Sequence, residues 1–141
     1  MNITLVYPPM WVRRDEYFGI TPPLGLCYLA SILEDHKVTI INAQEFGETG
    51  NNIIGKYKRI GLSSLEILEK IKQTHPDIVG ITCPLSIMWN DVATLSRTLK
   101  KELDCKIVIG GFQPSAFPEQ CLNESQADHV VVGEGEIAFK D

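Results

Sequence analysis

Short apolar runs alternate with amphipathic stretches along the whole chain. The five runs are residues 3–7, 37–42, 77–83, 106–110 and 128–132. They are dense in Ile, Val and Leu, which is typical of parallel strands covered on both faces. Between them, apolar residues recur every three or four positions, which predicts helices. We therefore predict an α/β domain with right-handed crossovers: a flavodoxin-like (Rossmann-like) three-layer sandwich with a five-stranded parallel sheet in the order 2-1-3-4-5.

Start signals place several helix ends. Thr21, followed by two prolines, predicts a helix start capped by a hydroxyl group. Ser63 and Glu66 have the spacing of a capping box, in which each side chain bonds the other residue's backbone N–H. Asn90 or Asp91 is the predicted cap of the helix after the third strand. Each predicted helix thus follows one of the apolar runs.

Two segments have no clean period. Residues 10–20 mix charged and aromatic side chains and are predicted to form a loop at the functional edge of the sheet. That loop either contacts a ligand or a partner domain, or covers the domain's own core. Residues 45–61 are rich in Gly, Asn and charge and are predicted to be an exposed insertion. Because the chain stops in what would be the first turn of a helix, we expect residues 1–141 to be one domain of a longer protein, with its last helix truncated.

Composition narrows the class of protein. The chain has 141 residues, 44% hydrophobic and 22% charged, as expected for one soluble domain with a real core. Its net charge of -5 argues against a nucleic-acid partner. The sequence begins without a basic leader and lacks an apolar run of about 18 residues, so we expect a cytoplasmic protein without a membrane span. The four cysteines have no CxxC spacing and are predicted to be structural thiols.

The fourth apolar run leads into Gly110 and Gly111. A strand that ends at the carboxyl edge of an open α/β sheet points toward the ligand crevice, and glycine lets another surface approach the backbone closely. The pair forms either the floor of a ligand site or a tight turn without a ligand.

The sequence lacks the motifs of three common classes of α/β domain. Pro8 and Pro9 stand where a dinucleotide-binding domain has GxGxxG and where a flavodoxin has its phosphate loop. A phosphorelay receiver needs an aspartate at the end of the third strand, and this chain has Thr82-Cys83-Pro84 there. A nucleotide-binding enzyme domain of the same architecture is disfavoured for the same reason.

Five motifs occur in order at the predicted strand ends and helix starts: PPLGLCYLA (22–30), VGIT (79–82), IGG (109–111), FPE (117–119) and GEGE (133–136). Together they resemble the N-terminal cobalamin-binding domain of cobalamin-dependent radical SAM enzymes. This group includes methyltransferases and the anaerobic magnesium-protoporphyrin monomethyl ester cyclase. The resemblance covers nearly the whole chain and implies that cobalamin is the cofactor.

The resemblance also implies site residues. Thr82 would face the nucleotide tail of cobalamin, and Gly110 and Gly111 would make room for it. The other implied contacts are Leu85, Phe112, Gln113, Pro114, Gly133, Glu134 and Gly135. For the segment 133–136, a flexible exit toward the next domain is the alternative.

Two departures from related patterns refine this hypothesis. The DxHxxG loop that supplies a cobalt ligand in other cobalamin-binding modules is missing after the first strand, so we expect binding without a histidine ligand. Many relatives have histidine where this chain has Gln113, and glutamine can also donate and accept hydrogen bonds. We assign no catalytic residue and no metal ligand.

The chain also lacks CxxxCxxC. S-adenosylmethionine and an iron–sulfur cluster are therefore expected only in a C-terminal radical SAM domain of the parent enzyme, and this chain alone is not expected to catalyse a reaction. The alternative hypothesis is a degenerate α/β domain that acts as a docking or regulatory surface without a cofactor.

Overall fold

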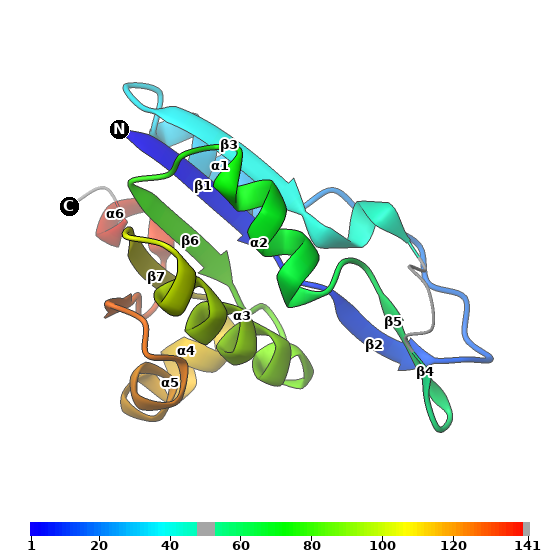
Figure 1. Ribbon diagram of the computed structural model, residues 1–141. Helices are drawn as coiled ribbons and strands as arrows, with labels where there is room; N and C mark the ends of the chain where they lie inside the picture. The colour runs from blue at the N-terminus through cyan, green and yellow to red at the C-terminus, as the bar shows by residue number, and fades with distance from the viewer. Residues whose placement is uncertain (48–52, 140–141) are drawn as a thin grey trace.

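A computed structural model describes residues 1–47 and 53–139. Five parallel strands form its main sheet, in the order β3-β1-β6-β7-β8 (Figure 1). They are β1 (Asn2–Tyr7), β3 (Lys37–Asn42), β6 (Ile78–Thr82), β7 (Lys106–Gly110) and β8 (His129–Val130). The register places Leu5 beside Ile40 and Gly80, so apolar positions of neighbouring strands share a face of the sheet.

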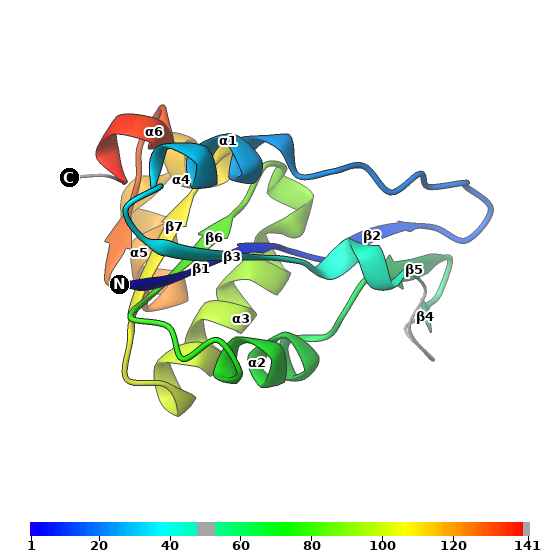
Figure 2. The same ribbon diagram turned by 90° about the horizontal axis from the view of Figure 1, so that it is seen from above.

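Helices cover both faces of this sheet, which gives three layers (Figure 2). α1 and α6 lie over one face, α2 and α3 lie over the other, and α5 packs against α3. The helices are α1 (Leu24–Ile32), η1 (Ala43–Phe46), α2 (Ser64–Lys72), η2 (Ser86–Met88), α3 (Trp89–Glu102), α4 (Phe112–Ala116), α5 (Pro118–Ser125) and α6 (Gly135–Ala138), of which η1 and η2 are 3-10 turns. The predicted three-layer α/β architecture around a five-stranded parallel sheet is confirmed. In the described part of the chain, no helix combines the length and the apolar character needed to cross a bilayer.

A second, antiparallel sheet extends beyond the carboxyl end of β1 (Figure 1). Its strands, in the order β2-β5-β4, are β2 (Met10–Arg13), β5 (Tyr57–Ile60) and β4 (Ile53–Ile54). The prediction of irregular structure was therefore wrong for these parts of residues 10–20 and 45–61, while residues 48–52 lie outside the described chain. Numbered over all strands, the main sheet has the order 3-1-6-7-8, so the predicted order 2-1-3-4-5 is not matched. Within that sheet, β1 lies between the two strands that follow it in the sheet along the chain, β3 and β6.

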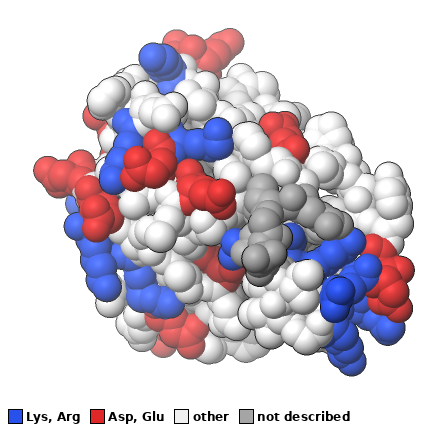
Figure 3. Space-filling view, turned by 45° about the vertical axis from the view of Figure 1, so that its right-hand side comes forward, with Lys and Arg blue, Asp and Glu red and all other residues white. Residues whose placement is uncertain are grey.

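The small sheet is fixed to the start of α3 by a polar contact. Trp11 Nε1 on β2 donates to Asp91 Oδ2 on α3 at 3.0 Å. The Arg59 guanidinium on β5 lies 5.8 Å from the centroid of the Trp11 ring, within the range of a cation–π contact. Burial raises the pKa of Asp91, against the opposing effects of Arg59 and the Trp11 hydrogen bond. Figure 3 shows Lys and Arg side chains gathered beside acidic ones where this end of the molecule comes forward.

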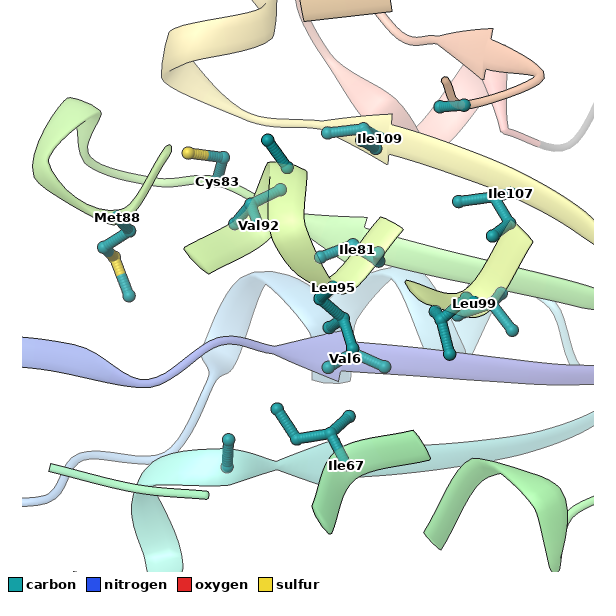
Figure 4. Packing of buried hydrophobic residues seen from close by; sticks show 14 of the residues in the cluster. Val6, Ile67, Ile81, Cys83, Met88, Val92, Leu95, Leu99, Ile107 and Ile109 are labelled. Atoms are coloured by element: carbon teal, nitrogen blue, oxygen red, sulfur yellow. The ribbon is translucent and has the colours of Figure 1, made fainter. Parts of the chain in front are cut away.

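The larger apolar core lies between the sheet and the helices α2 and α3. Val92, Leu95 and Leu99 of α3 are fully buried and point toward the strands (Figure 4). Ile81 of β6 and Ile109 of β7 meet them from the sheet. Each side chain of this size contributes about 1.5–3 kcal/mol when fully buried. A smaller cluster, which includes Leu5 and Leu26, fills the space between the sheet and α1.

The helix starts agree only in part with the sequence. The capping box is confirmed: Ser63 N donates to Glu66 Oε2 at 2.8 Å, and Glu66 N donates to Ser63 Oγ at 3.3 Å. The cap at Thr21 was wrong, because α1 begins after Pro23 without a side-chain cap. The cap at Asn90 or Asp91 was also wrong, since α3 continues directly from η2 and the preceding residue already has helical backbone angles. The predicted fifth strand, residues 128–132, is reduced to the two residues of β8.

Candidate functional site

A cavity of about 350 Å³ lies between the main sheet and α1, at the carboxyl ends of β1, β6 and β7. Leu5, Gly80 and Val108 form its floor on the sheet. α1 and the residues before it supply one wall: Pro22, Pro23, Leu24, Gly25, Leu26 and Leu29. The segment after β8 supplies the opposite wall: Val131, Gly133, Glu134, Gly135, Glu136 and Phe139. The carboxyl edge of an open α/β sheet is where such folds usually bind ligands.

Gly80 lets two side chains that line the cavity pack against the face of β6. A Cβ atom at this position would lie 2.9 Å from Leu5 Cδ2 and 3.1 Å from Cε2 of the Phe139 ring. Real Cβ contacts are essentially never as short as the first of these, so a larger residue would need its neighbours to move. Gly80 therefore lets the ring of Phe139, the residue after α6, lie close to the face of β6.

Gly111 lines the cavity and also has a purpose within the fold. Its φ of 112° and ψ of -166° lie in a region that is essentially restricted to glycine. A Cβ atom there would lie 2.6 Å from Cys83 O and 2.8 Å from Cys83 C. The missing side chain thus allows the turn after β7 to lie against the backbone after β6. A Cβ on Gly110 would meet only Val131 Cβ, at an ordinary 3.6 Å.

Hydrogen bonds tie the rim of the cavity together. Thr82 pairs with Gly110 in the sheet register, and Cys83 N donates to Gly110 O at 2.8 Å. On the other side, Ser115 Oγ donates to Gly111 O at 2.8 Å and accepts from Gly133 N at 3.0 Å. The ends of β6 and β7 and the segment after β8 therefore form one connected rim.

The predicted site residues fall into two groups. Those that line the cavity are Thr82, Gly110, Gly111, Gly133, Glu134 and Gly135. Leu85, Phe112, Gln113 and Pro114 do not line it. Leu85 and Phe112 are 51% and 67% exposed, and Pro114 is buried. Phe112, Gln113 and Pro114 belong to α4, where Pro114 is accommodated in the first turn.

Sequence reasoning missed several cavity residues. Gly80 lies within the VGIT motif, and an isolated glycine in an apolar strand often marks a close approach. Leu26 and Leu29 lie on the apolar face of α1, and the same face borders the cavity. No signal pointed to Phe139, because its contact with Gly80 joins residues far apart in the sequence.

The cavity lacks positive charge within the described part of the chain. Its ionisable lining residues are Tyr7, Glu134 and Glu136. A site for a pyrophosphate group normally offers Lys or Arg side chains. The lining is instead mostly apolar, with backbone amides and carbonyl groups at the rim. This chemistry suits a largely uncharged ligand group.

Two of the cysteines are buried near the rim. Burial, with a smaller contribution from Cys121, raises the pKa of the Cys83 thiol to about 12. Cys83 Sγ lies 3.4 Å from Leu85 O, so the protonated thiol can donate a weak hydrogen bond there. Burial also raises the pKa of Cys121. Both thiols therefore stay protonated at neutral pH, whereas Cys27 is exposed on α1.

Curated proteins resemble the chain over nearly its full length. It is 36% identical to an uncharacterized methyltransferase of Pyrococcus horikoshii, over 100% of this chain and 28% of the relative. It is 32% identical to the cytidylyl-2-hydroxyethylphosphonate methyltransferase of Streptomyces wedmorensis, over 98% of this chain and 27% of the relative. It is 28% identical to the anaerobic magnesium-protoporphyrin IX monomethyl ester cyclase of Rubrivivax gelatinosus, over 96% and 23%. The chain thus spans about a quarter of the length of these relatives.

A solved structure and a family profile complete the comparison. A cobalamin-binding protein of Desulfitobacterium hafniense shares the fold, with a TM-score of 0.61 and 17% identity over 98% of this chain and 56% of that protein. The profile of the B12 binding domain matches residues 10–141, which include both walls of the cavity. The chain belongs to the B12-binding domain family.

Proposed function

We propose that this chain is a cobalamin-binding module that positions the cofactor for a second domain of a longer enzyme. The observation that carries this proposal is the apolar cavity at the carboxyl edge of the sheet, in a member of the B12-binding domain family. The cavity would receive the nucleotide tail, and the corrin ring would lie outside it at the same edge. Bound cobalamin supplies the methyl-transfer or radical chemistry, whereas the residues of this chain supply binding and orientation.

The size and lining of the cavity agree with the tail rather than the whole cofactor. Its volume of about 350 Å³ is near the lower end of the range for ligand pockets, roughly 300–1,000 Å³. Leu26, Leu29 and Val108 offer apolar surface for the base of the tail. The exposed side chains of Leu85 and Phe112, which do not line the cavity, would be available to the ring.

The charge of the cavity disfavours nucleotides with several phosphates. Glu134 and Glu136 are its acidic residues, and no Lys or Arg accompanies them among the described lining residues. The tail of cobalamin carries a single phosphodiester and would tolerate this environment better than a pyrophosphate. No DxHxxG loop follows β1 in the sequence, so we propose binding without a histidine ligand to cobalt.

The parent enzyme is proposed to carry a C-terminal radical SAM domain. Two of the relatives are named methyltransferases and one is named a cyclase, and each is much longer than this chain. S-adenosylmethionine and an iron–sulfur cluster would bind in that second domain. Sequencing the region beyond Asp141 tests this directly: a CxxxCxxC motif within roughly one domain's length, about 100 residues, supports the proposal, and its absence counts against it.

Titration with hydroxocobalamin tests the binding function. The purified chain should shift the visible spectrum of the cofactor, and FMN and NAD should compete poorly. Gly25→Leu should weaken binding, because Gly25 lines the cavity and nothing lies within 4 Å of its Cβ position, so the new side chain can narrow the cavity without a clash. Cys27→Leu is the matched control, since Cys27 is exposed on the same helix and does not line the cavity. Absence of binding at high micromolar cofactor would favour a docking domain without a cofactor.

A further inference from the structure

One hydroxyl group joins the two sides of the cavity rim. Ser115, on α4, donates from Oγ to Gly111 O at 2.8 Å and accepts from Gly133 N at 3.0 Å. Gly111 belongs to the turn after β7, and Gly133 belongs to the wall after β8. Both bonds therefore pass through the same oxygen atom.

The hydrogen bond from Gly133 N to Ser115 Oγ lies where the backbone pairing of β8 ends. Val131 N donates to Ile109 O at 2.8 Å, and beyond it the chain leaves the sheet. Val132 is 58% exposed, and nothing lies within 4 Å of the Cβ position at Gly133. The segment that starts at Gly133 therefore has little packing of its own at this point. Its distance from Gly111 depends on the Ser115 hydroxyl.

The chemistry requires a short side chain that both donates and accepts. Serine and threonine hydroxyl groups do both, whereas alanine does neither and a thiol is weak in both roles. The bond to Gly111 spans four residues along a helical turn, a geometry that threonine also adopts. Threonine should therefore replace serine here, and alanine should not.

We infer that Ser115 is a positioning residue that sets the width of the cavity for the nucleotide tail of the cofactor. This inference rests on the proposed function of the cavity. Loss of the hydroxyl frees the wall at Gly133 and Glu134 to move away from Gly111. The apolar floor and α1 remain in place. The tail then loses one of its two walls, while the contacts of the corrin ring are unaffected.

The test compares Ser115→Ala, Ser115→Thr and the control Thr98→Ala in the 141-residue chain. Thr98 Oγ1 makes a similar helical bond, to Thr94 O at 2.9 Å, on exposed α3 surface that does not line the cavity. The probes are hydroxocobalamin and cobinamide, which has the ring but no nucleotide tail, with Kd read from the visible spectrum. Ser115→Ala should raise the Kd for hydroxocobalamin about tenfold and that for cobinamide less than twofold. Ser115→Thr and Thr98→Ala should stay within about twofold of the unmodified chain.

Amide hydrogen exchange gives a readout that does not depend on the cofactor. In the absence of ligand, the Gly133 amide should exchange about tenfold faster in Ser115→Ala, and at the original rate in Ser115→Thr and Thr98→Ala. Unchanged exchange in Ser115→Ala would overturn the inference whether or not cobalamin binds. So would an equal loss of affinity for both probes. If the unmodified chain binds neither probe while Gly133 responds as expected, the cofactor proposal fails and the link through Ser115 stands as a purely structural one.

Discussion

Gly111 is the position where one added methyl group should cost the fold most. Gly111→Ala places a Cβ atom 2.6 Å from Cys83 O. The backbone angles, φ 112° and ψ -166°, are also nearly closed to alanine. Neither problem can be relieved by a side-chain rotation, because the atoms that clash belong to the backbone. The turn after β7 must therefore move away from the end of β6.

The two costs can be estimated separately. Holding a residue other than glycine in this region of backbone angles costs about 1–3 kcal/mol. Forcing a methyl group into a filled space costs about 1–3 kcal/mol more. The sum, about 2–6 kcal/mol, is a large part of the free energy of unfolding of an ordinary domain, about 5–15 kcal/mol. For a chain of this length it corresponds to roughly 3–5 °C in Tm for each kcal/mol.

Gly110→Ala is the matched control. Its Cβ atom would meet Val131 Cβ at 3.6 Å, an ordinary contact, and its φ lies outside the left-handed region. In a strand, alanine is more favourable than glycine by about 0.5–1 kcal/mol, so this variant should be as stable as the unmodified chain or slightly more stable. Both glycines line the cavity, so the comparison measures the contact with Cys83 together with the backbone strain at Gly111.

Equilibrium urea unfolding measures the difference. The chain has two tryptophans, Trp11 and Trp89, whose fluorescence should report on the transition. Gly111→Ala should lower the free energy of unfolding by at least about 2 kcal/mol relative to Gly110→Ala, with an unchanged m-value. A difference below about 1 kcal/mol would show that the turn can relax around the methyl group, and the argument from close backbone approach would be refuted.

Three further predictions concern polar groups outside the cavity. Burial alone would raise the pKa of Asp128, but the backbone N–H of Ile107 at 2.8 Å and the Lys100 ammonium group at 3.0 Å lower it overall. The Asp128 carboxylate therefore stabilises the fold above the ordinary Asp pKa, and this stabilisation should be lost as pH falls below about 4. Asp128→Ala should lower the free energy of unfolding by about 1–3 kcal/mol at pH 7 and weaken its dependence on acid pH, as measured by urea unfolding at a series of pH values. An unchanged loss of stability at acid pH in this variant would contradict the prediction. The pH dependence expected for Asp91 has the opposite sign, because burial raises its pKa. The contribution of Asp91 to the free energy of unfolding is full below about pH 4 and declines as pH rises through the raised pKa. The stability of the unmodified chain relative to Asp91→Asn should therefore fall between pH 4 and pH 7, and a constant difference would exclude this explanation. Ser63→Ala should cost about 1 kcal/mol through loss of the α2 cap, measured by thermal unfolding against Ser64→Ala, and equal Tm values for the two variants would argue against it.

The sequence predicts those parts of the fold that depend on nearby residues. Residues 37–42 are the strand β3 in the structure, with the same bounds, because an apolar run between polar turns is itself the signal. The capping box at Ser63 is equally local. Helix starts were missed where a neighbouring turn replaced the cap, as at Met88. These errors arise because the start of a helix also depends on the turn that precedes it in the folded chain, which the local sequence pattern does not show.

The pairing of β2 with β5 in the small sheet could not be predicted, for a related reason. β2 pairs with β5, so Trp11 faces Arg59 across 48 positions of sequence. No two-residue turn joins these strands, and such a turn is the strongest short-range sign of antiparallel pairing. The mixture of charge and aromatic residues in 10–20, which suggested a loop, reflects a strand whose Trp11 faces a neighbouring helix through Asp91. The pairing is set by distant contacts and not by the local pattern.

The glycines of the site show how the same residue type can serve separate purposes. Sequence alone suggested that Gly110 and Gly111 make room for a ligand. In the structure, the missing side chain of Gly111 makes room for the backbone at Cys83, and the missing side chain of Gly80 makes room for the side chains of Leu5 and Phe139. Gly133 supplies a positive φ of 80° where the chain leaves the sheet. The pair after β7 therefore acts on the cavity indirectly: it brings the ends of β6 and β7 together and places Gly111 O where Ser115 can bond it. Ligand space in this domain comes from the floor and the two walls, and the Gly-Gly turn holds their common rim in place.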